Sequence, residues 1–398
     1  MISVAEALAR VTADLHPLPA EQVPVAQGCG RVLAADLAAR LSQPPFPASA
    51  MDGYAVRTAD VGLLPATLTL IGEAAAGHPF ARRVGAGEAV RIFTGAPVPD
   101  GADLVVIQEN TSAEGARIIV RDRSVEDFVR PAGGDFRSGD VPLRAGKRLT
   151  PRDLLLAAQM NYAMLPVRRR PVVAILASGD ELVAPGEMPG PGQIVSSIPA
   201  ALAPLIRNAG GEPVALGIAR DTMDSLAACL ARAKDANILV TIGGASVGDH
   251  DLMHRALQAA GFDIGFQTVA MRPGKPLMYG RRGGCHVLGL PGNPVSAMLC
   301  CAIFLSPMIA SFTGADSEKS RPRKARLANP LEANGARQHY MRARFTHPGG
   351  DGLVVAPLPS QDSSLVSILA AADCLIVRPP HAPAATAGEF VDILPLDF

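Results

Sequence analysis

The pattern of apolar and polar positions in the first part of the chain predicts two helices on either side of a strand-rich segment. Ser3 and Glu6 form a capping-box pattern, and the apolar run that follows predicts a helix ending near residues 16–19. A second helix is predicted to begin at residues 150–151, because proline is favoured at the first helical position. Residues 41–135 instead contain short β-branched runs broken by Gly and Pro, which predicts an inserted all-β segment. These runs are residues 66–71, 89–93, 104–108 and 117–121.

From residue 171 onwards, apolar runs of strand length alternate with helical windows. The helical windows cover residues 197–209, 223–234 and 250–260, and another follows Pro294. Because the runs between them are almost continuously hydrophobic, the alternation predicts a parallel sheet covered by helices on both faces. The predicted strands are PVVAILAS, PVALGI, NILVTI, IGFQTVA and CHVLGL.

The rest of the chain predicts a linker and a last β-rich unit. Residues 314–330 are charged and weakly periodic, as is typical of a linker, and residues 326–398 return to short β runs that predict a small β-barrel. The expected fold class is therefore multidomain α/β, with a central parallel α/β sandwich, an inserted β-rich domain, an elongated helical N-terminal region and a C-terminal barrel. The expected domains are residues 1–40 together with 136–170, then 41–135, 171–318 and 326–398.

Composition and charge exclude several classes of protein. Of the 398 residues, 48% are hydrophobic and 19% are charged, which excludes disorder as the main character of the chain. Lys+Arg 37 equals Asp+Glu 37, whereas proteins that wrap nucleic acid usually carry a basic excess, so no nucleic-acid partner is expected. The six cysteines are scattered without a C-x-x-C pair, which favours reduced and mostly buried thiols in a cytoplasmic protein. The N-terminus, MISVAEALAR, does not have the pattern of a signal peptide.

One stretch is apolar enough to be compared with a membrane span. Residues 295–312 carry no charge, and their length is near the lower limit for a spanning helix. They contain three serines and a proline, and they lack flanking basic or aromatic anchors. We therefore expect a buried core helix and no association with a membrane.

Unusual loops follow the predicted strands of the α/β segment. Ligands of open parallel sheets bind beyond the carboxyl ends of the strands, and these loops begin at those ends. Their glycines let the backbone approach a ligand closely and present its N–H groups. The loops are SGDE (178–181), Arg220-Asp221, GGASVGDHD (243–251), RPGKP (272–276) and PGNP (291–294).

The charges in these loops suit a phosphorylated ligand. Arg272 and Lys275 supply positive charge next to the glycine-rich loop. The carboxylates would repel phosphate, so we expect them to hold Mg²⁺ or the hydroxyls and amines of the ligand. Neither the G-x-x-x-x-G-K-[ST] P-loop nor the G-x-G-x-x-G dinucleotide fingerprint occurs in the chain. The carboxylates are Glu181, Asp221, Asp249 and Asp251.

Each loop also has a purely structural interpretation. GGASVG can be a simple turn, and Asp221 can be the N-cap of the helix after it. Five such loops at one predicted sheet edge nevertheless favour a functional crevice. His250 and His254 lie four residues apart, but no third ligand is nearby, so we interpret them as ordinary helix positions rather than a metal pair.

Six motifs, in order along almost the whole chain, together resemble one family. They are MDGYAV (51–56), RIFTGAPVPDGADLVVIQE (91–109), SGDEL, GGASVGDHD, PGKP and PGNPVSA. This combination resembles the MoeA family of molybdopterin molybdenumtransferases, whose eukaryotic relative is the E domain of gephyrin. The resemblance implies an L-shaped homodimer of four-domain subunits. It also implies a reaction that uses Mg²⁺ and inserts molybdate, a substrate, into adenylated molybdopterin, with release of AMP and molybdenum cofactor.

The resemblance assigns roles to individual residues. Glu181, Asp221 and Asp251 are implied to bind the metal and the nucleotide, and Lys275 is implied to bind phosphate. A flap from the partner subunit is implied to close over the molybdate end with Asp52, Thr94, Arg130 and Asp135. Molybdopterin adenylyltransferase is a further implied partner. Residues implied to bind the substrate in the crevice are Ser178, Gly243, Gly244, Ser246, Gly248, Asp249, Arg272, Pro291 and Pro294.

Three positions depart from the usual sequence of the family. Where the family has Asp-Thr/Ser-Asn, this chain has residues 196–198, Ser-Ser-Ile; Arg272 replaces a lysine; and Asp373 stands where Asn is common. Because of the first departure, a molybdopterin-binding or scaffold paralogue without turnover stays open as an alternative to the transferase. A nucleotide-processing enzyme that shares only the α/β domain is a third interpretation, but it leaves MDGYAV and FTGAP without a role.

Overall fold

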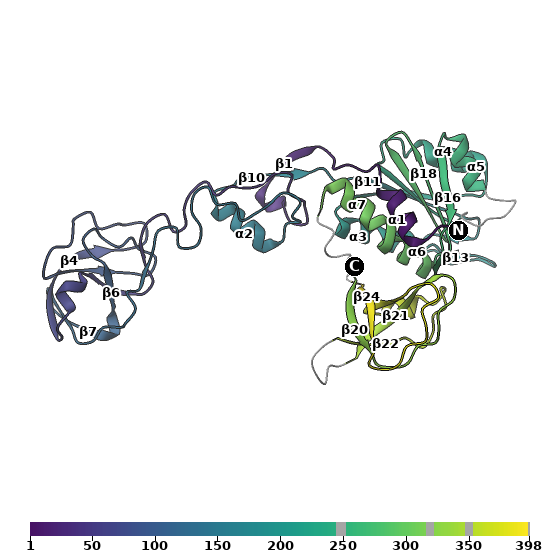
Figure 1. The fold of residues 1–398 in the computed structure, drawn as a ribbon. Coiled ribbons are helices and arrows are strands. Elements are labelled where there is room, and N and C mark those ends of the chain that lie inside the picture. The colour runs from purple at the N-terminus through teal and green to yellow at the C-terminus, as the bar shows by residue number, and fades with distance from the viewer. Residues whose placement is uncertain (244–251, 316–321, 347–352, 397–398) are drawn as a thin grey trace.

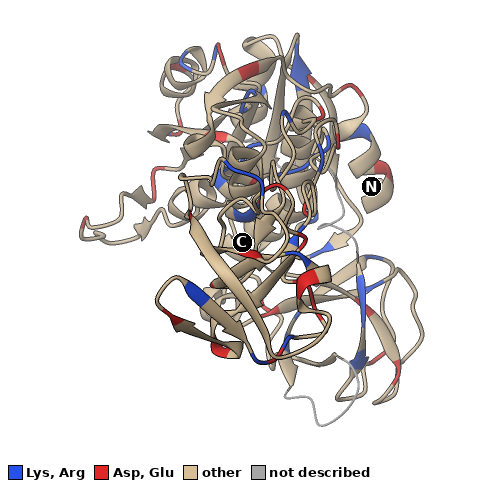
Figure 2. Ribbon diagram, turned by 90° about the vertical axis from the view of Figure 1, so that its left-hand side faces the viewer, with Lys and Arg blue, Asp and Glu red and all other residues tan. Residues whose placement is uncertain are grey.

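The computed structural model describes residues 1–243, 252–315, 322–346 and 353–396, and these form an elongated molecule (Figure 1). A β-rich segment lies at one end, and an extended connection joins it to the α/β segment and the C-terminal barrel at the other. Figure 2 shows basic and acidic residues interspersed along the ribbon, as their equal numbers in the sequence lead us to expect. The arrangement confirms the predicted multidomain α/β fold class.

The α/β segment is built on a six-stranded sheet with the strand order β14-β11-β15-β19-β18-β16. Strands β14, β11, β15 and β19 are parallel, whereas β18 and β16 run antiparallel to their neighbours. The chain passes from β11 to β14 on one side and then to β15 on the other, so the strand order reverses between β11 and β15. The bounds are β11 Val172–Ser178, β14 Glu212–Ala219, β15 Ile238–Ile242, β16 Asp263–Thr268, β18 Pro276–Arg282 and β19 Cys285–Leu290.

This sheet differs from the predicted one at the edge formed by β18 and β16. The sequence pattern did not predict β18, and residues 269–275 connect the two strands without a helix. Such a short connection joins antiparallel strands, since parallel neighbours need a long crossover. Because β16 is antiparallel to β18, and β18 is antiparallel to β19, β16 still ends at the same sheet edge as the parallel strands.

Helices cover both faces of the sheet, as predicted. One face packs against α3 (Ile198–Ala209), α6 (Pro294–Cys300) and α7 (Ser306–Thr313), and the other packs against α4 (Met223–Ala231) and α5 (Leu252–Ala259). The N-terminal helix α1 (Val4–Thr12) joins the first face, because its apolar side chains are buried in the same core. The first residues of the chain, which the sequence grouped with the elongated segment, therefore pack in the α/β core (Figure 1). The buried side chains of α1 are Val4, Ala7 and Val11.

The apolar stretch predicted as a core helix is a core helix. Helix α6, the π-helical turn η4 (Cys301–Leu305) and α7 run on continuously from Pro294 to Thr313. This helix is long and apolar enough to cross a membrane, but 72% of its most apolar window is buried inside the structure. The burial confirms the interpretation of residues 295–312 as part of the core.

All six cysteines are free thiols. Cys285, Cys300, Cys301 and Cys374 are buried, and Cys29 is exposed. Burial raises the pKa of the Cys300 thiol to about 12, and a thiol held neutral in apolar surroundings is a poor nucleophile. The prediction of mostly buried thiols that form no disulfide is confirmed.

The elongated segment consists of a two-stranded ribbon and one helix. Strand β1 (Ala20–Pro24) pairs antiparallel with β10 (Met164–Arg168), and helix α2 (Pro151–Gln159) packs beside the short turn η1 (Val25–Gln27). The predicted helix start at residues 150–151 is confirmed. Thr150 and Asp153 exchange side-chain and backbone hydrogen bonds in a capping box.

The inserted segment is all-β, as predicted. Its six-stranded sheet has the order β6-β3-β5-β4-β8-β7, and a two-stranded sheet of β2 and β9 lies next to it. Each of the four predicted β-branched runs lies on a strand of this sheet. The bounds are β2 Ala48–Ser49, β3 Gly53–Val56, η2 Thr58–Val61, β4 Ala66–Ala74, β5 Glu88–Ile92, β6 Leu104–Ile107, η3 Gln108–Asn110, β7 Thr111–Glu114, β8 Arg117–Val120 and β9 Val129–Arg130.

The C-terminal strands close into a barrel, as predicted. Strand β21 pairs with both β22 and β23, and the order β21-β22-β20-β24-β23 returns to β21. A short strand of the α/β segment, β17 (Met271–Arg272), pairs with β21 and ties the RPGKP loop to the barrel. The barrel elements are β20 Arg323–Leu327, β21 Gln338–Thr346, β22 Val354–Pro357, α8 Val366–Ala370, β23 Cys374–Arg378 and β24 Phe390–Pro395.

Arg148 fastens the elongated segment to the α/β segment. Its guanidinium donates to the carbonyl oxygens of Ala209 at 2.5 Å and Asn208 at 3.4 Å, at the end of α3, and to Gly30 at 3.2 Å. Arg148→Ala should lower the free energy of unfolding by roughly 2 kcal/mol, because it leaves these partly buried carbonyls without a donor. Urea unfolding measures the loss, with Arg152→Ala on the exposed face of α2 as the control. An unchanged midpoint for Arg148→Ala would show that the junction does not depend on this side chain.

Candidate functional site

The loops predicted to form a crevice leave from one edge of the sheet. The register pairs Ser178 with Ala219, Ala177 with Ile242, and Ile242 with Leu290, so the four parallel strands end side by side. At the same edge, the end of β16 pairs with Pro276, at the start of β18. The SGDE, Arg220-Asp221, RPGKP and PGNP loops and the first residue of GGASVGDHD therefore start together, as the sequence predicted.

Ser178 and Gly243 touch at the point where the strand order reverses. Gly243 has φ +88, and a Cβ on it would lie 2.7 Å from the carbonyl oxygen of Ser178. A side chain at residue 243 would therefore clash with the neighbouring strand, which explains why glycine is needed here. Ligands of open α/β sheets bind at this kind of switch point, so the closest approach of the two loops marks the centre of the crevice.

Asp180 and Asp221 join the first two loops. The N–H of Asp180 donates to Oδ2 of Asp221 at 3.4 Å, and the N–H of Asp221 donates to Oδ1 of Asp180 at 3.3 Å. Thr222 caps α4 by accepting from the N–H of Ser225, so the N-cap role considered for Asp221 belongs to the next residue. Asp180 was not predicted as a site residue from the sequence, although its place in the SGDE loop could have indicated it.

Glu181 folds back over the turn that precedes it. Its carboxylate lies so close to Gly179 that a Cβ on this glycine would meet Oε2 at 2.3 Å. Its backbone carbonyl accepts from Ile194, where β12 (Leu182–Val183) and β13 (Ile194–Val195) pair beyond the loop. The carboxylate is exposed, on the same turn as Asp180.

Several predicted site residues lie outside the described residues, namely Gly244, Ser246, Gly248, Asp249 and Asp251. Within the described residues, no three His, Cys, Asp or Glu side chains form a metal-binding group. The predicted metal set of Glu181, Asp221 and Asp251 therefore stays a prediction. The acids that are described supply only oxygen ligands, and Mg²⁺ commonly takes one or two carboxylates and completes its shell with water and substrate phosphate.

Lys275 and Arg272 are exposed in the RPGKP loop, which the structure places at the same edge. The carbonyl of Lys275 accepts from Val269 at 3.0 Å, which closes the loop. Arg272 pairs in register with His339 of β21. The loop thus connects the crevice with the barrel.

His339 lies in a cationic cluster that the sequence did not reveal. It is buried, and its Nε2 has no hydrogen-bond partner. Burial is the largest cause that lowers the pKa of His339 from its usual 6.5 to about 4, and nearby positive charges add to the effect. These charges belong to Arg272, Arg342 and Arg337. No local motif could have shown this cluster, because it joins residues more than sixty positions apart.

The PGNP loop leads into α6, with Pro294 at the start of the helix. Pro291 is buried, and the neighbouring Asn293 donates from its side-chain amide to Ser363 Oγ at 3.2 Å. The carbonyl of Ser363 accepts from Val295 at 3.3 Å. A barrel loop therefore covers the beginning of α6, and PGNP serves as the rigid helix entry that the sequence predicted.

Asp52 and Thr94 are brought together in the β-rich segment. The backbone N–H and the hydroxyl of Thr94 both donate to Oδ1 of Asp52 at 2.8 Å. These two donors are the main cause that lowers the pKa of Asp52, with a smaller effect of Arg91. The carboxylate is therefore ionised at neutral pH, and it remains exposed.

Arg130 and Asp135 are exposed on the same segment. Arg130 lies on β9 and pairs in register with Ala48, shortly before the turn that carries Asp52. The N–H of Asp135 donates to the carbonyl of Gln43 at 2.9 Å. The role of these two residues in a flap with Asp52 stays a prediction.

The two groups of predicted site residues lie toward opposite ends of the elongated molecule (Figure 1). Figure 1 shows the β-rich segment, which carries Asp52, separated from the α/β sheet by the whole elongated segment. Within one chain, Asp52 therefore cannot reach the crevice that carries Asp221. If both groups act on one substrate, a second copy must supply one of them.

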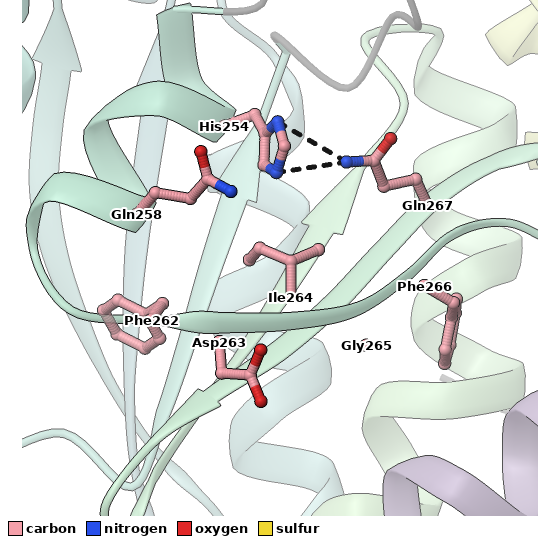
Figure 3. Close-up of a pocket in the computed structure, with 8 residues that line it drawn as sticks. All are labelled: His254, Gln258, Phe262, Asp263, Ile264, Gly265, Phe266 and Gln267. Carbon is pink, nitrogen blue, oxygen red and sulfur yellow. Dashed lines mark hydrogen bonds between the residues drawn. The ribbon is translucent and has the colours of Figure 1, made fainter.

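A separate pocket of about 460 Å³ lies between α5 and the edge strand β16 (Figure 3). Gln267 Nε2 lies 3.1 Å from Nε2 of His254 in its lining. His254 is thus a helix-face residue that contacts a neighbouring strand, in line with its predicted role. The pocket lining contains none of the residues predicted to bind the ligand; its residues are His254, Gln258, Phe262, Asp263, Ile264, Gly265, Phe266 and Gln267.

Three family models match successive parts of the chain. Residues 2–160 match the MoeA N-terminal region (domain I and II), residues 174–311 match a probable molybdopterin binding domain, and residues 324–396 match the MoeA C-terminal region (domain IV). Together the three models span almost the whole chain.

Relatives and a solved structure agree with these matches. Molybdopterin molybdenumtransferase of Haemophilus influenzae is 31% identical over 100% of this chain and 99% of its own length. The enzyme of the same name from Bacillus subtilis is 32% identical over 99% of this chain and 94% of its own length. The crystal structure of the molybdopterin biosynthesis moeA protein from Pyrococcus horikoshii OT3 superimposes with a TM-score of 0.83, at 27% identity and 99% coverage of both chains. The chain therefore belongs to the MoeA family along its whole length.

Proposed function

We propose that this protein is a molybdopterin molybdenumtransferase. It inserts molybdate into adenylated molybdopterin and releases AMP, in the last step of molybdenum cofactor synthesis. The observation that carries the proposal is one sheet edge from which paired carboxylates leave β11 and β14 and a cationic loop leaves β16, in a chain of the MoeA family. We further propose that the four segments expected from the sequence act as its domains, with α1 assigned to the α/β domain because it packs in that core.

The Asp180–Asp221 side of the crevice is the proposed nucleotide end. Ser178 and Gly243 bring the backbone close to a ligand, and the exposed carboxylates can accept from ribose hydroxyls or from the adenine amine. Asp221 and Glu181 would hold Mg²⁺ together with substrate phosphate, and the metal would neutralise the charge that develops as AMP leaves. Asp251, which was also assigned to the metal from the sequence, is the proposed third Mg²⁺ ligand.

The RPGKP loop is the proposed phosphate and oxyanion end. Lys275 carries a compact ammonium group suited to phosphate. The planar guanidinium of Arg272 can donate two hydrogen bonds to oxygens of the same ligand. Behind the loop, His339 stays neutral and its Nε2 can donate a hydrogen bond, while the arginines around it supply a field that favours an anion. Molybdate is a tetrahedral dianion, so this chemistry fits it as well as a phosphate group.

The flap of a second copy completes the proposed site. Asp52, Thr94, Arg130 and Asp135 would close over the molybdate end of the crevice of the partner subunit. An ionised Asp52 can accept a hydrogen bond from a dithiolene thiol or hold a water molecule there, because its lowered pKa keeps it ionised and its donors fix its direction. The homodimer, its cytoplasmic location and delivery of the substrate by molybdopterin adenylyltransferase are parts of the same proposal.

AMP release tests this function directly. The purified protein should release AMP from adenylated molybdopterin only when molybdate and Mg²⁺ are both present. Binding of the substrate without any release of AMP would overturn the transferase and favour the scaffold paralogue without turnover, which the Ser196–Ser197 departure from the family first suggested. Complementation of a strain that lacks the transferase provides the corresponding test in cells.

The buried His339 predicts a specific dependence of stability on pH. Its folded pKa of about 4 lies below the usual 6.5, so between these values the unfolded chain binds more protons and stability falls as the pH is lowered. Over this window the loss should reach roughly 3 kcal/mol at this one residue. His339→Gln should remove that part of the slope in urea titrations at pH 6.5 and pH 4, whereas the same slope in wild type and variant would contradict the assignment.

A further inference from the structure

The turn that carries Asp52 is held by a cycle of hydrogen bonds. Arg91 on β5 donates from Nη1 to the carbonyl oxygen of Gly53 at 3.2 Å and from Nη2 to Oε1 of Gln108 at 2.7 Å. The N–H of Gln108 donates to the carbonyl oxygen of Asp52 at 3.2 Å, which closes the cycle. The two peptide groups on either side of Gly53 are thus held by one arginine and its glutamine partner.

The surroundings of Gly53 leave its backbone little conformational freedom. A Cβ on Gly53 would lie 2.0 Å from the carbonyl oxygen of Val106, so β3 and β6 approach each other as closely as glycine permits. On the other side, the guanidinium of Arg91 lies 5.1 Å from the ring centroid of Tyr54 and 4.8 Å from that of Phe93. The two rings hold the guanidinium in place by cation–π contact.

We infer that Arg91 is a positioning residue that sets the direction of the Asp52 carboxylate. Gln108, which bonds Arg91, and Thr94, which bonds Asp52, act together with it. The inference rests on the proposed function for the role of Asp52 in turnover. Arg91 fixes the backbone of Asp52 through Gly53 and Gln108, and Thr94 fixes the side chain. The hydrogen bonds of Arg91 go to Gly53 and Gln108, both within the β-rich segment.

An arginine is needed for this task because three properties are used together. Its planar fork bridges two acceptors, its guanidinium lies in cation–π contact with two rings, and its charge adds to the effect of Thr94 that lowers the pKa of Asp52. A lysine would keep the charge, but it could not span both oxygens or stack against the rings. Arg91→Lys therefore separates positioning from simple charge.

The test is the steady-state rate of AMP release by Arg91→Lys in the full-length protein. Arg117→Lys, at an exposed position on β8 of the same sheet, is the matched control. We expect kcat of Arg91→Lys to fall between about tenfold and about a hundredfold with little change in KM, because a misdirected group slows the reaction without preventing binding. The acid limb of its pH profile should also move to higher pH, and Arg117→Lys should behave as wild type.

A second readout does not depend on turnover. The Asp52 carboxyl carbon, labelled with ¹³C and identified by comparison with Asp52→Asn, should titrate at a higher pH in Arg91→Lys than in the wild type. The charge is kept in this variant, but a carboxylate turned away from Thr94 loses the two donors that lower its pKa. The inference would be overturned if the kcat, the pH profile and the Asp52 titration of Arg91→Lys were the same as those of the wild type. If the wild type itself released no AMP, the proposed function would fail, but the titration would still decide whether Arg91 controls Asp52.

Discussion

Asp221→Asn is expected to fold as the wild type does and to lose at least about a hundredfold in the rate of AMP release. The carboxylate of Asp221 accepts from the N–H of Asp180, and an asparagine oxygen can accept the same bond. The substitution therefore keeps the link between the two loops and removes only the negative charge. Glu181→Gln should show the same loss, since we assign both charges to one metal and one nucleotide.

The measurement compares AMP release with the midpoint of urea unfolding. Asp224→Asn is the matched control, because Asp224 lies in the first turn of α4, three residues beyond Asp221 and outside the proposed crevice. Its rate should stay within about twofold of the wild type, since a surface substitution near a helix end costs only a few tenths of a kcal/mol. Wild-type rates in Asp221→Asn and Glu181→Gln would show that the crevice is assigned to the wrong loops.

The sequence predicted the crevice because each of its parts is local. A hydrophobic run marks a strand, and the residues directly after it mark the loop, so Ser178, Asp221 and Pro291 could be placed at one sheet edge without coordinates. The same local pattern missed β18, because PLMYGRR begins with a proline and ends in Gly-Arg-Arg. The loop of Lys275 was still placed correctly, since β16 and the parallel strands end at the same edge.

Contacts between distant parts of the chain could not be predicted in this way. His339 meets Arg272 only because the barrel adds its strand β21 to β17, and no period or motif encodes that pairing. In the same way, α1 packs in the α/β core although the chain leaves that core at once for the elongated segment. The role of Arg91 depends on its hydrogen bond to Gly53, which lies on the neighbouring strand β3. The position of Arg91 in the RIFTGAP motif does not predict this contact.

Mixed dimers of Asp52→Asn and Glu181→Gln are expected to recover activity that neither variant has alone. In a heterodimer, the crevice of the chain that carries Asp52→Asn keeps its own Glu181 and receives an intact Asp52 from the other chain. One of its two sites is therefore restored, so a purified heterodimer should reach about half the wild-type rate. Two different affinity tags and successive purification steps isolate the heterodimer before AMP release is measured.

The control pair is Glu181→Gln with Asp221→Asn, because both changes lie in the same crevice. Every site in that heterodimer lacks one of the two acids, so mixing should recover nothing. Recovery in the first pair and not in the second would mean that Asp52 reaches the crevice of its partner, which is the only geometry open to a flap held so far from its own α/β sheet. Equal failure of both pairs would contradict a site shared between subunits, and a monomer in solution would contradict it independently.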